Sequence, residues 1–192
     1  SENLLLRVSH LLENKVIILI ILIIMNKSLF QYLLLNFENN KYMVKKINSG
    51  AGKEKGVLIP LEAEDAILLL VFSDGTIAKC NTKDLFLLKE YQIYETNINS
   101  NELLLHFIVP EECLIGCISE KYIEIKQTER LQISCVNDIK KEILFEASAV
   151  ENYFILPYDS IYEQYINHPT ILNNLSEDIQ QNLNNYGVII EN

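Results

Sequence analysis

The sequence has few basic residues, and those few are unevenly distributed. Its 192 residues include 16 Lys and Arg against 26 Asp and Glu, which gives a formal net charge of −10. No Lys or Arg follows Lys141, whereas eight acidic residues do. A protein that binds nucleic acid needs a basic surface to neutralise phosphates. We therefore expect no nucleic-acid partner.

The sequence also lacks an apolar run long enough for a transmembrane helix. Its longest run, Val16–Met25, has ten residues, whereas a spanning helix needs about 20. Asn26-Lys27 stands where a secretory signal would place its small cleavage residues. We expect no membrane partner. Residues 1–35 are expected to be an N-terminal extension, in which residues 1–24 either lie upstream of a natural start at Met25 or form a helix and strand packed on the core.

Motifs of metal sites and of covalent catalysis are missing as well. The four cysteines form no CxxC pair, and Cys113-x3-Cys117 with His106 is poorly spaced for zinc. We expect buried free thiols, a reducing compartment, and neither a metal nor a cofactor. No nucleophile elbow occurs, and Ser49–Lys53 lacks the GxxxxGK[ST] spacing of a phosphate loop.

One weak enzyme pattern remains. Glu124-Ile125-Lys126 resembles half of a metal-dependent nuclease site, where a carboxylate and a lysine flank a metal-bound water. Glu111 is the candidate second acid in this alternative. The chain contains three acid-x-Lys triplets, and about two are expected by chance from its composition. We therefore expect that the protein is not an enzyme.

Residues 40–120 have the pattern of successive short strands. Apolar or alternating runs are separated by turn residues such as Ser73-Asp74-Gly75-Thr76 and Pro110-Glu111-Glu112. This spacing predicts a small β-sandwich or barrel. The expected strands cover residues 41–47, 56–61, 66–72, 84–88, 91–95, 102–109 and 113–118, with 122–126 as a further candidate.

The pattern changes in the last third of the chain. Val136–Val150 predicts a helix with Ile139, Ile143 and Leu144 on one face. A second helical region begins near Pro157, and a last helix starts at Ser176 and ends at Gly187. We therefore expect an α+β, β-rich fold. It would consist of a sandwich of residues 36–150 closed by the helix, and a solvated, acidic helical tail of residues 151–192.

The segment from Asn40 to Glu120 resembles the pleckstrin-like receptor-for-ubiquitin domain of the proteasomal ubiquitin receptor. The similarity covers about 80 of the 192 residues and rests on the order and spacing of several short motifs. These motifs are Asn40–Val44, the ungapped stretch Lys55–Thr76 with Glu64-Asp65, Phe72 and Asp74-x-Thr76, then Asp84–Leu88, Leu103–Phe107 and Leu114–Glu120.

This resemblance implies a non-catalytic subunit of the proteasome regulatory particle, located in the cytoplasm and nucleus. It implies a pleckstrin-homology-like sandwich with a capping C-terminal helix, bound to the large scaffold subunit. It also implies ubiquitin binding, in which apolar loop residues cover the hydrophobic patch of ubiquitin. By position, the ubiquitin contacts are Ile67, Leu88, Tyr91 and Phe107, and the scaffold groove includes Ile115 and Cys117.

The chain departs from the family pattern at two of these positions. The family has an aromatic residue at the position of Leu88 and an acidic residue at that of Tyr91, and both departures act against ubiquitin affinity. Ile115 and Cys117 are alternatively core residues. The stretch Ile161–Ile179 resembles the opening helices of a family domain that binds a deubiquitinase, with packing against the sandwich as the alternative. An unrelated β-rich adaptor or structural protein is the alternative to the whole assignment.

Overall fold

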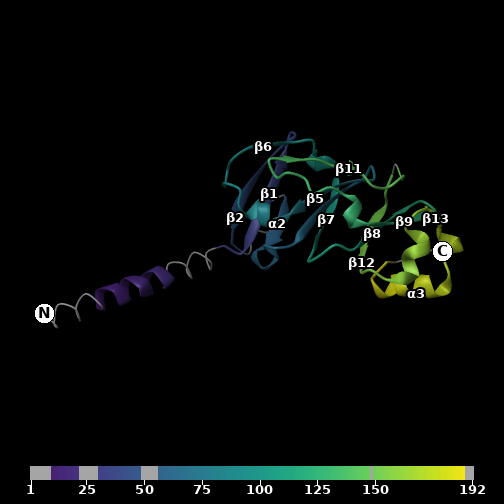
Figure 1. The fold of residues 1–192 in the computed structure, drawn as a ribbon. Helices are drawn as coiled ribbons and strands as arrows, with labels where there is room; N and C mark the ends of the chain where they lie inside the picture. The colour runs from purple at the N-terminus through teal and green to yellow at the C-terminus, as the bar shows by residue number, and fades with distance from the viewer. Residues whose placement is uncertain (1–9, 22–29, 49–55, 148, 189–192) are drawn as a thin grey trace.

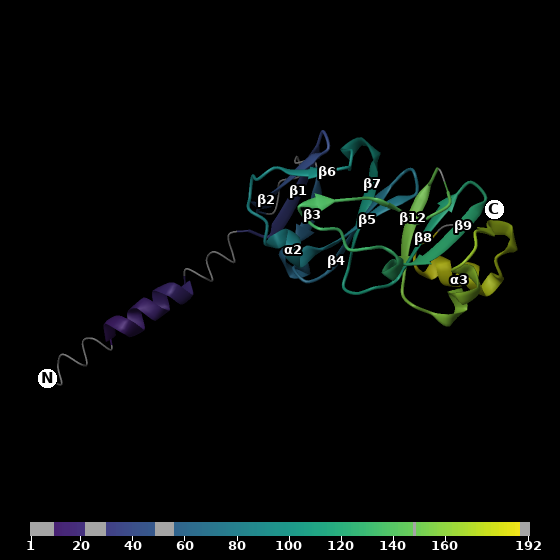
Figure 2. The same cartoon turned by 45° about the horizontal axis from the view of Figure 1, so that its top comes forward.

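The structure, a computed structural model, describes residues 10–21, 30–48, 56–147 and 149–188. Within these residues the fold is α+β and strand-rich, as the sequence predicts. Figures 1 and 2 show a body of β-strands with a C-terminal helical segment at one end and the helix of residues 10–21 beyond the other. No helix in the described part of the chain has the length and apolar content to cross a membrane.

Sheet A contains five strands in the order β10-β6-β2-β1-β3. The turn between β1 and β2 is Asn39-Asn40, and both residues have positive φ, at 50° and 60°. Asparagine tolerates this conformation, which a tight two-residue hairpin requires. The strands are β1 (Tyr32–Glu38), β2 (Lys41–Ile47), β3 (Val57–Pro60), β6 (Tyr94–Thr96) and β10 (Asp138–Ile139).

Sheet B is the middle layer, with the strand order β11-β5-β4-β7. Residues 68–72 of β4 are all fully buried, because both faces of this sheet are covered. This explains why β4 is a continuous apolar run and does not alternate. The strands are β4 (Ile67–Phe72), β5 (Thr76–Asn81), β7 (Leu103–Val109) and β11 (Glu142–Ile143).

Sheet C has the order β12-β8-β9-β13. Its strands are β8 (Leu114–Ser119), β9 (Tyr122–Gln127), β12 (Asn152–Leu156) and β13 (Thr170–Ile171). The helices of the body are α2 (Thr82–Phe86) and α3 (Glu177–Asn185), with 3-10 turns η1 (Leu61–Ala63), η2 (Ser100–Glu102), η3 (Thr128–Arg130), η4 (Ser160–Tyr165) and η5 (Leu172–Asn174).

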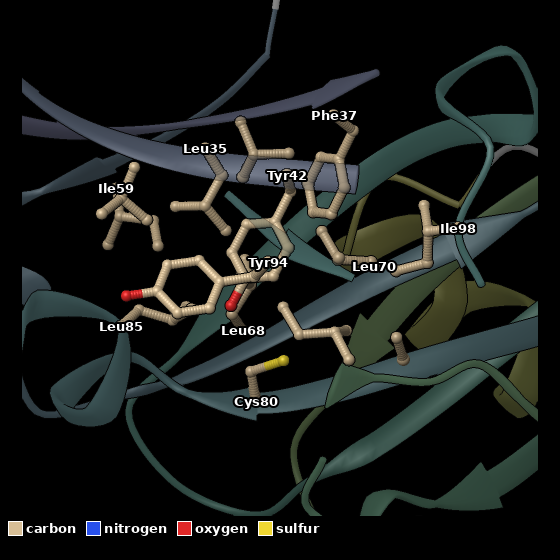
Figure 3. Close-up of a cluster of buried hydrophobic side chains, with 14 of the residues drawn as sticks. Leu35, Phe37, Tyr42, Ile59, Leu68, Leu70, Cys80, Leu85, Tyr94 and Ile98 are labelled. Atoms are coloured by element: carbon tan, nitrogen blue, oxygen red, sulfur yellow. The ribbon is translucent and has the colours of Figure 1, made fainter. Parts of the chain in front are cut away.

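The first hydrophobic core lies between sheets A and B. Figure 3 shows side chains from both sheets meeting around Tyr42, which is 2% exposed. The Tyr42 hydroxyl donates a hydrogen bond to the Val136 carbonyl, so the one polar atom of this ring is satisfied. Two sheets packed on a shared core give the predicted sandwich arrangement. The core residues that Figure 3 labels are Leu35, Phe37, Tyr42, Ile59, Leu68, Leu70, Cys80, Leu85, Tyr94 and Ile98.

Two further cores extend the stack. The second lies between sheets B and C and contains Leu69, Val71 and Phe145. The third lies between sheet C and the C-terminal segment, where Tyr162 and Leu183 are fully buried. Because strand β12 pairs with β8, the predicted boundary at residue 150 runs through a sheet. The predicted solvated tail is therefore a packed layer that covers the outer side of sheet C.

The last helix agrees with its sequence signals. The Ser176 side chain accepts a hydrogen bond from the backbone N–H of Ile179 at 3.4 Å, which caps the start of α3. Gly187 follows the helix with a φ of 77°, the left-handed conformation that ends many helices.

The predicted capping helix over Val136–Val150 is wrong. This segment crosses from sheet A, through β10, to sheet B, through β11. Ile139 is fully buried in the first core, whereas Ile143 is 84% exposed, so the two do not share one helical face. The Glu124 carboxylate accepts the backbone N–H groups of Glu146 and Ala147, both at 3.0 Å, and holds the segment extended.

Two other expectations need correction. The predicted strand at residues 84–88 is the end of α2 and the turn after it, where Leu85 is buried and Leu87 is exposed. The N-terminal extension was expected to reach residue 35, but β1 begins at Tyr32 and lies in the middle of sheet A. A candidate start at Met25 falls outside the described residues. Residues 10–21 are helical, but all of them are exposed, so they do not pack on the core.

Candidate binding surface

The outer face of sheet A packs against neither of the other sheets. Alternation along β1 and β2 sends Leu35 and Val44 into the first core and sends Asn36 and Met43 outwards. Two adjoining hollows of about 680 and 330 Å³ lie along this face, and the larger is also lined by Ser100, Asn101 and Leu103, from η2 and β7. We call this surface the sheet A groove, and its principal residues are Leu34, Asn36, Glu38, Met43, Lys45, Tyr91 and Ile93.

Tyr91 is held at the groove by backbone contacts. Its N–H donates to the Val44 carbonyl at 3.0 Å, and the neighbouring Glu90 carboxylate accepts the Lys46 N–H at 2.8 Å. Tyr91 has a φ of 63°, an unfavourable conformation for a bulky side chain. These contacts with β2 fix the turn in spite of that conformation. The side chains of Tyr91 and Ile93 remain 62% and 66% exposed beside the groove.

The four residues expected to contact ubiquitin do not lie on one surface. Ile67 and Phe107 are partly buried against the second core, on the sheet C side of sheet B. Leu88 is partly buried against the first core, on the opposite side. Tyr91 lies over the outer face of sheet A. Of the four, Tyr91 is the side chain that is exposed and adjoins a large hollow.

The two residues expected in the scaffold groove are core residues. Ile115 and Cys117 lie on β8 with no exposed surface, inside the second core. Their side chains touch the middle of the stack and are out of reach of a docked protein. The structure therefore contradicts the expected scaffold-binding groove at these residues. It agrees with the alternative that both are core residues.

The nuclease pattern also has a structural explanation. Glu124 and Lys126 are buried on β9, and the Glu124 carboxylate is occupied by the two N–H groups of the 146–147 segment. Glu111 lies in an exposed turn, and the hollow beside Glu124 includes neither Glu111 nor Lys126. Among the described residues, no group of three or more His, Cys, Asp and Glu side chains could hold a metal ion.

A buried polar cluster centred on Lys79 did not emerge from the sequence. Lys79 is 2% exposed, and its ammonium donates to the Glu112 carboxylate and to the carbonyls of Thr128 and Leu131. The Thr128 hydroxyl donates to the same carboxylate and accepts the N–H of Cys113 at 2.9 Å. The signal in the sequence was a lysine inside an apolar strand. These hydrogen bonds join strand β5 of sheet B to the segments that flank strands β8 and β9 of sheet C. Because all three donors of the ammonium have acceptors, Lys79 presents no free nucleophile.

The cysteines differ sharply in exposure, which gives a testable prediction. Cys80, Cys113 and Cys117 are buried, and burial raises their thiol pKa values to about 12, 11 and 12, while Cys135 is exposed. We expect a disulfide reagent at pH 8 to modify one thiol of the native protein rapidly and all four in urea. Rapid modification of two or more native thiols would contradict the structure.

These thiols also predict how stability depends on pH. The folded state holds their protons more tightly than the unfolded state, in which the thiol pKa is near 9. Their contribution is complete below pH 9 and is lost as the pH rises towards 12. The free energy of unfolding, measured in urea between pH 8 and 11, should therefore fall at the alkaline end. Replacing Cys117 by Ala should flatten that decline.

Comparisons with known proteins leave the family open. No family model matches the chain, and no curated protein matches it. Among solved structures, the chain is similar to a crystal structure of the C-terminal domain of DNA topoisomerase IV, with 12% sequence identity and a TM-score of 0.48. The alignment covers 67% of this chain and 48% of that chain, so it spans about half of the topoisomerase domain.

Proposed function

We propose that this chain is a non-catalytic protein-binding module and that the sheet A groove is its docking surface. The observation that carries the proposal is the fixed presentation of Tyr91 and Ile93 beside the groove, where both remain largely exposed. Exposed aromatic and aliphatic anchors surrounded by polar side chains are typical of the residues that dominate protein interfaces. Asn36, Glu38 and Lys41 supply that polar surround.

The partner we propose is a folded protein with a small apolar patch, and ubiquitin is the first candidate. Support comes from the resemblance of Asn40–Glu120 to the ubiquitin-receptor domain. Of the four contact positions that the resemblance implies, Tyr91 adjoins the groove, and its aromatic ring replaces the acidic residue of the family. On this proposal the protein is a subunit of the proteasome regulatory particle in the cytoplasm and nucleus, attached to the large scaffold subunit. An unrelated β-rich adaptor, which would use the groove for another protein, is the alternative.

A contact between the C-terminal segment and a deubiquitinase is a further part of this proposal. The side chains of Tyr162, Leu175 and Ile179 are buried against sheet C. The contact would therefore depend on outward side chains of the same segment, of which Ile161 and Ile171 are exposed.

The groove is tested by replacing Tyr91 with Ala and titrating the protein with ubiquitin in a calorimeter. Loss of an interface aromatic anchor should weaken binding by about tenfold or more. Tyr122→Ala is the matched control, because Tyr122 is an exposed tyrosine on sheet C, far from the groove in the stack. Equal affinities of the two variants would exclude the groove. An absence of proteasomal subunits from a pull-down with the wild-type chain would exclude the proteasome and favour the adaptor.

A further inference from the structure

The helix of residues 10–21 carries a large exposed apolar surface that the proposed function does not use. Leu11, Leu12 and every residue of 16–21 are exposed to between 48% and 60%. Figure 1 shows this helix apart from the stacked sheets. Such a surface is unfavourable in water, because apolar area gains stability only when it is removed from solvent.

The apolar side chains surround the helix. Residues 16–21 are six successive apolar residues, and successive residues of an α-helix are about 100° apart, so six of them cover the full circumference. A helix that binds in a protein groove or a coiled coil has one apolar stripe and a polar opposite face. A helix that is apolar on every side is buried either in the core of a protein or in the hydrocarbon of a lipid bilayer, and the three cores of the described residues contain none of residues 10–21.

The length of the apolar run restricts how it can enter a bilayer. The run Val16–Met25 has ten residues, and ten residues of α-helix extend about 15 Å, which is less than the ~30 Å hydrocarbon core. Polar side chains flank the apolar part on both sides, with Glu13, Asn14 and Lys15 before it and Asn26-Lys27 after it in the sequence. This pattern fits an apolar segment that enters one leaflet without crossing it, while the polar side chains before it stay at the interface.

We propose that the apolar residues 16–21 insert into one leaflet of a lipid bilayer, with residues 10–15 at the interface, and hold the β-stack at its surface. This inference is independent of the partner proposed for the sheet A groove, and it replaces the sequence-based expectation of no membrane partner. Residues 1–30 contain three basic and two acidic side chains, a net charge of +1. Attraction to anionic lipids is therefore weak, and insertion depends on the apolar side chains and not on salt.

The proposal is tested by flotation of the full chain with phosphatidylcholine vesicles at low and high salt. The wild-type chain should float with the vesicles under both conditions. In Ile17→Asp/Ile20→Asp the partition coefficient should fall by at least about 100-fold, because a buried carboxylate is strongly disfavoured in hydrocarbon. The matched control is Leu87→Asp/Ile143→Asp, which makes the same change at two exposed apolar residues of the body and should float as the wild type does.

A fluorescence measurement on the same chain gives a second readout. The sequence contains no tryptophan, so Leu19→Trp introduces a single reporter into the helix. Its emission should shift to shorter wavelength when phosphatidylcholine vesicles are added. The proposal is overturned if the wild-type chain does not float, or if it floats only with anionic vesicles and dissociates in salt. The proposal would also be overturned if the wild-type chain self-associates without lipid and Ile17→Asp/Ile20→Asp abolishes that association. In that case a second copy of the protein would cover the helix.

Discussion

Replacing Gly116 by Val should lower the free energy of unfolding by about 3 kcal/mol or more. Gly116 lies opposite Phe154 in the β8–β12 pair, and a Cβ at this position would lie 2.2 Å from the Phe154 ring. The ring is buried in the third core and cannot move aside without opening the contact between sheet C and the C-terminal segment. Urea denaturation followed by circular dichroism measures the change.

A glycine in open space provides the control for this prediction. Gly187 follows α3, and a Cβ there meets no atom of the described residues within 4 Å, so Gly187→Ala is expected to carry mainly the backbone strain of its positive φ. That strain amounts to about 1 kcal/mol. In a protein that already carries Phe154→Ala, Gly116→Val should lower the free energy of unfolding much less, because the introduced valine and the Phe154 side chain would otherwise occupy the same volume. If Gly116→Val lowered the free energy of unfolding no more than Gly187→Ala does, this would contradict the packing of sheet C.

Replacing Lys79 by Ala should destabilise the protein by about 3 kcal/mol. The change leaves the Glu112 carboxylate and two backbone carbonyls without their buried ammonium partner. Removing one member of a buried ion pair is costly because the other charge stays behind without compensation. Glu112 is partly exposed, at 32%, so the loss should fall at the lower end of the range for such pairs. Thermal or urea unfolding at pH 7 measures it.

A surface ion pair and a double substitution are the controls for Lys79. Lys140 pairs with Asp138 at 2.7 Å on an exposed surface, so Lys140→Ala should change the stability little. Lys79→Met/Glu112→Leu removes both charges and should recover part of the loss, since neither charge is left unpaired. If Lys79→Ala matched Lys140→Ala, the cluster would not join sheets B and C as described.

Most strands could be predicted from the sequence because their patterns depend on local rules. The alternating segment 41–47 and the continuous apolar segment 66–72 correspond to β2 and β4, and the Ser73–Thr76 turn lies between β4 and β5. The Ser176 cap and Gly187 mark the ends of α3. In each case the side chains that determine the element are close together in the chain.

The segment 136–150 was mispredicted because its burial depends on two distant cores. Ile139 contributes to the core between sheets A and B, and Phe145 contributes to the core between sheets B and C. Helical spacing in the sequence does not distinguish this arrangement from one apolar face. Val136, Ile139 and Ile143 are also β-branched, a residue type that favours strands.

The candidate site was predicted in part, and the reason is again long-range packing. Tyr91 was identified through the family resemblance, and the structure places it on the groove. Ile115 and Cys117 were assigned to a scaffold groove through the same resemblance, but both face sheet B in the second core. The opposite face of β8 is covered as well, by residues 152–188, which the sequence suggested to be a solvated tail.

Titration of the isotope-labelled protein with unlabelled ubiquitin, monitored by nuclear magnetic resonance, tests the proposal that the outer face of sheet A binds protein. We expect the amide signals of Met43, Tyr91 and Ile93 to shift progressively until ubiquitin saturates the protein, while those of Ile115 and Cys117 do not shift. Shifts confined to the surroundings of Ile67 and Phe107, or an absence of shifts at saturating ubiquitin, would contradict this proposal.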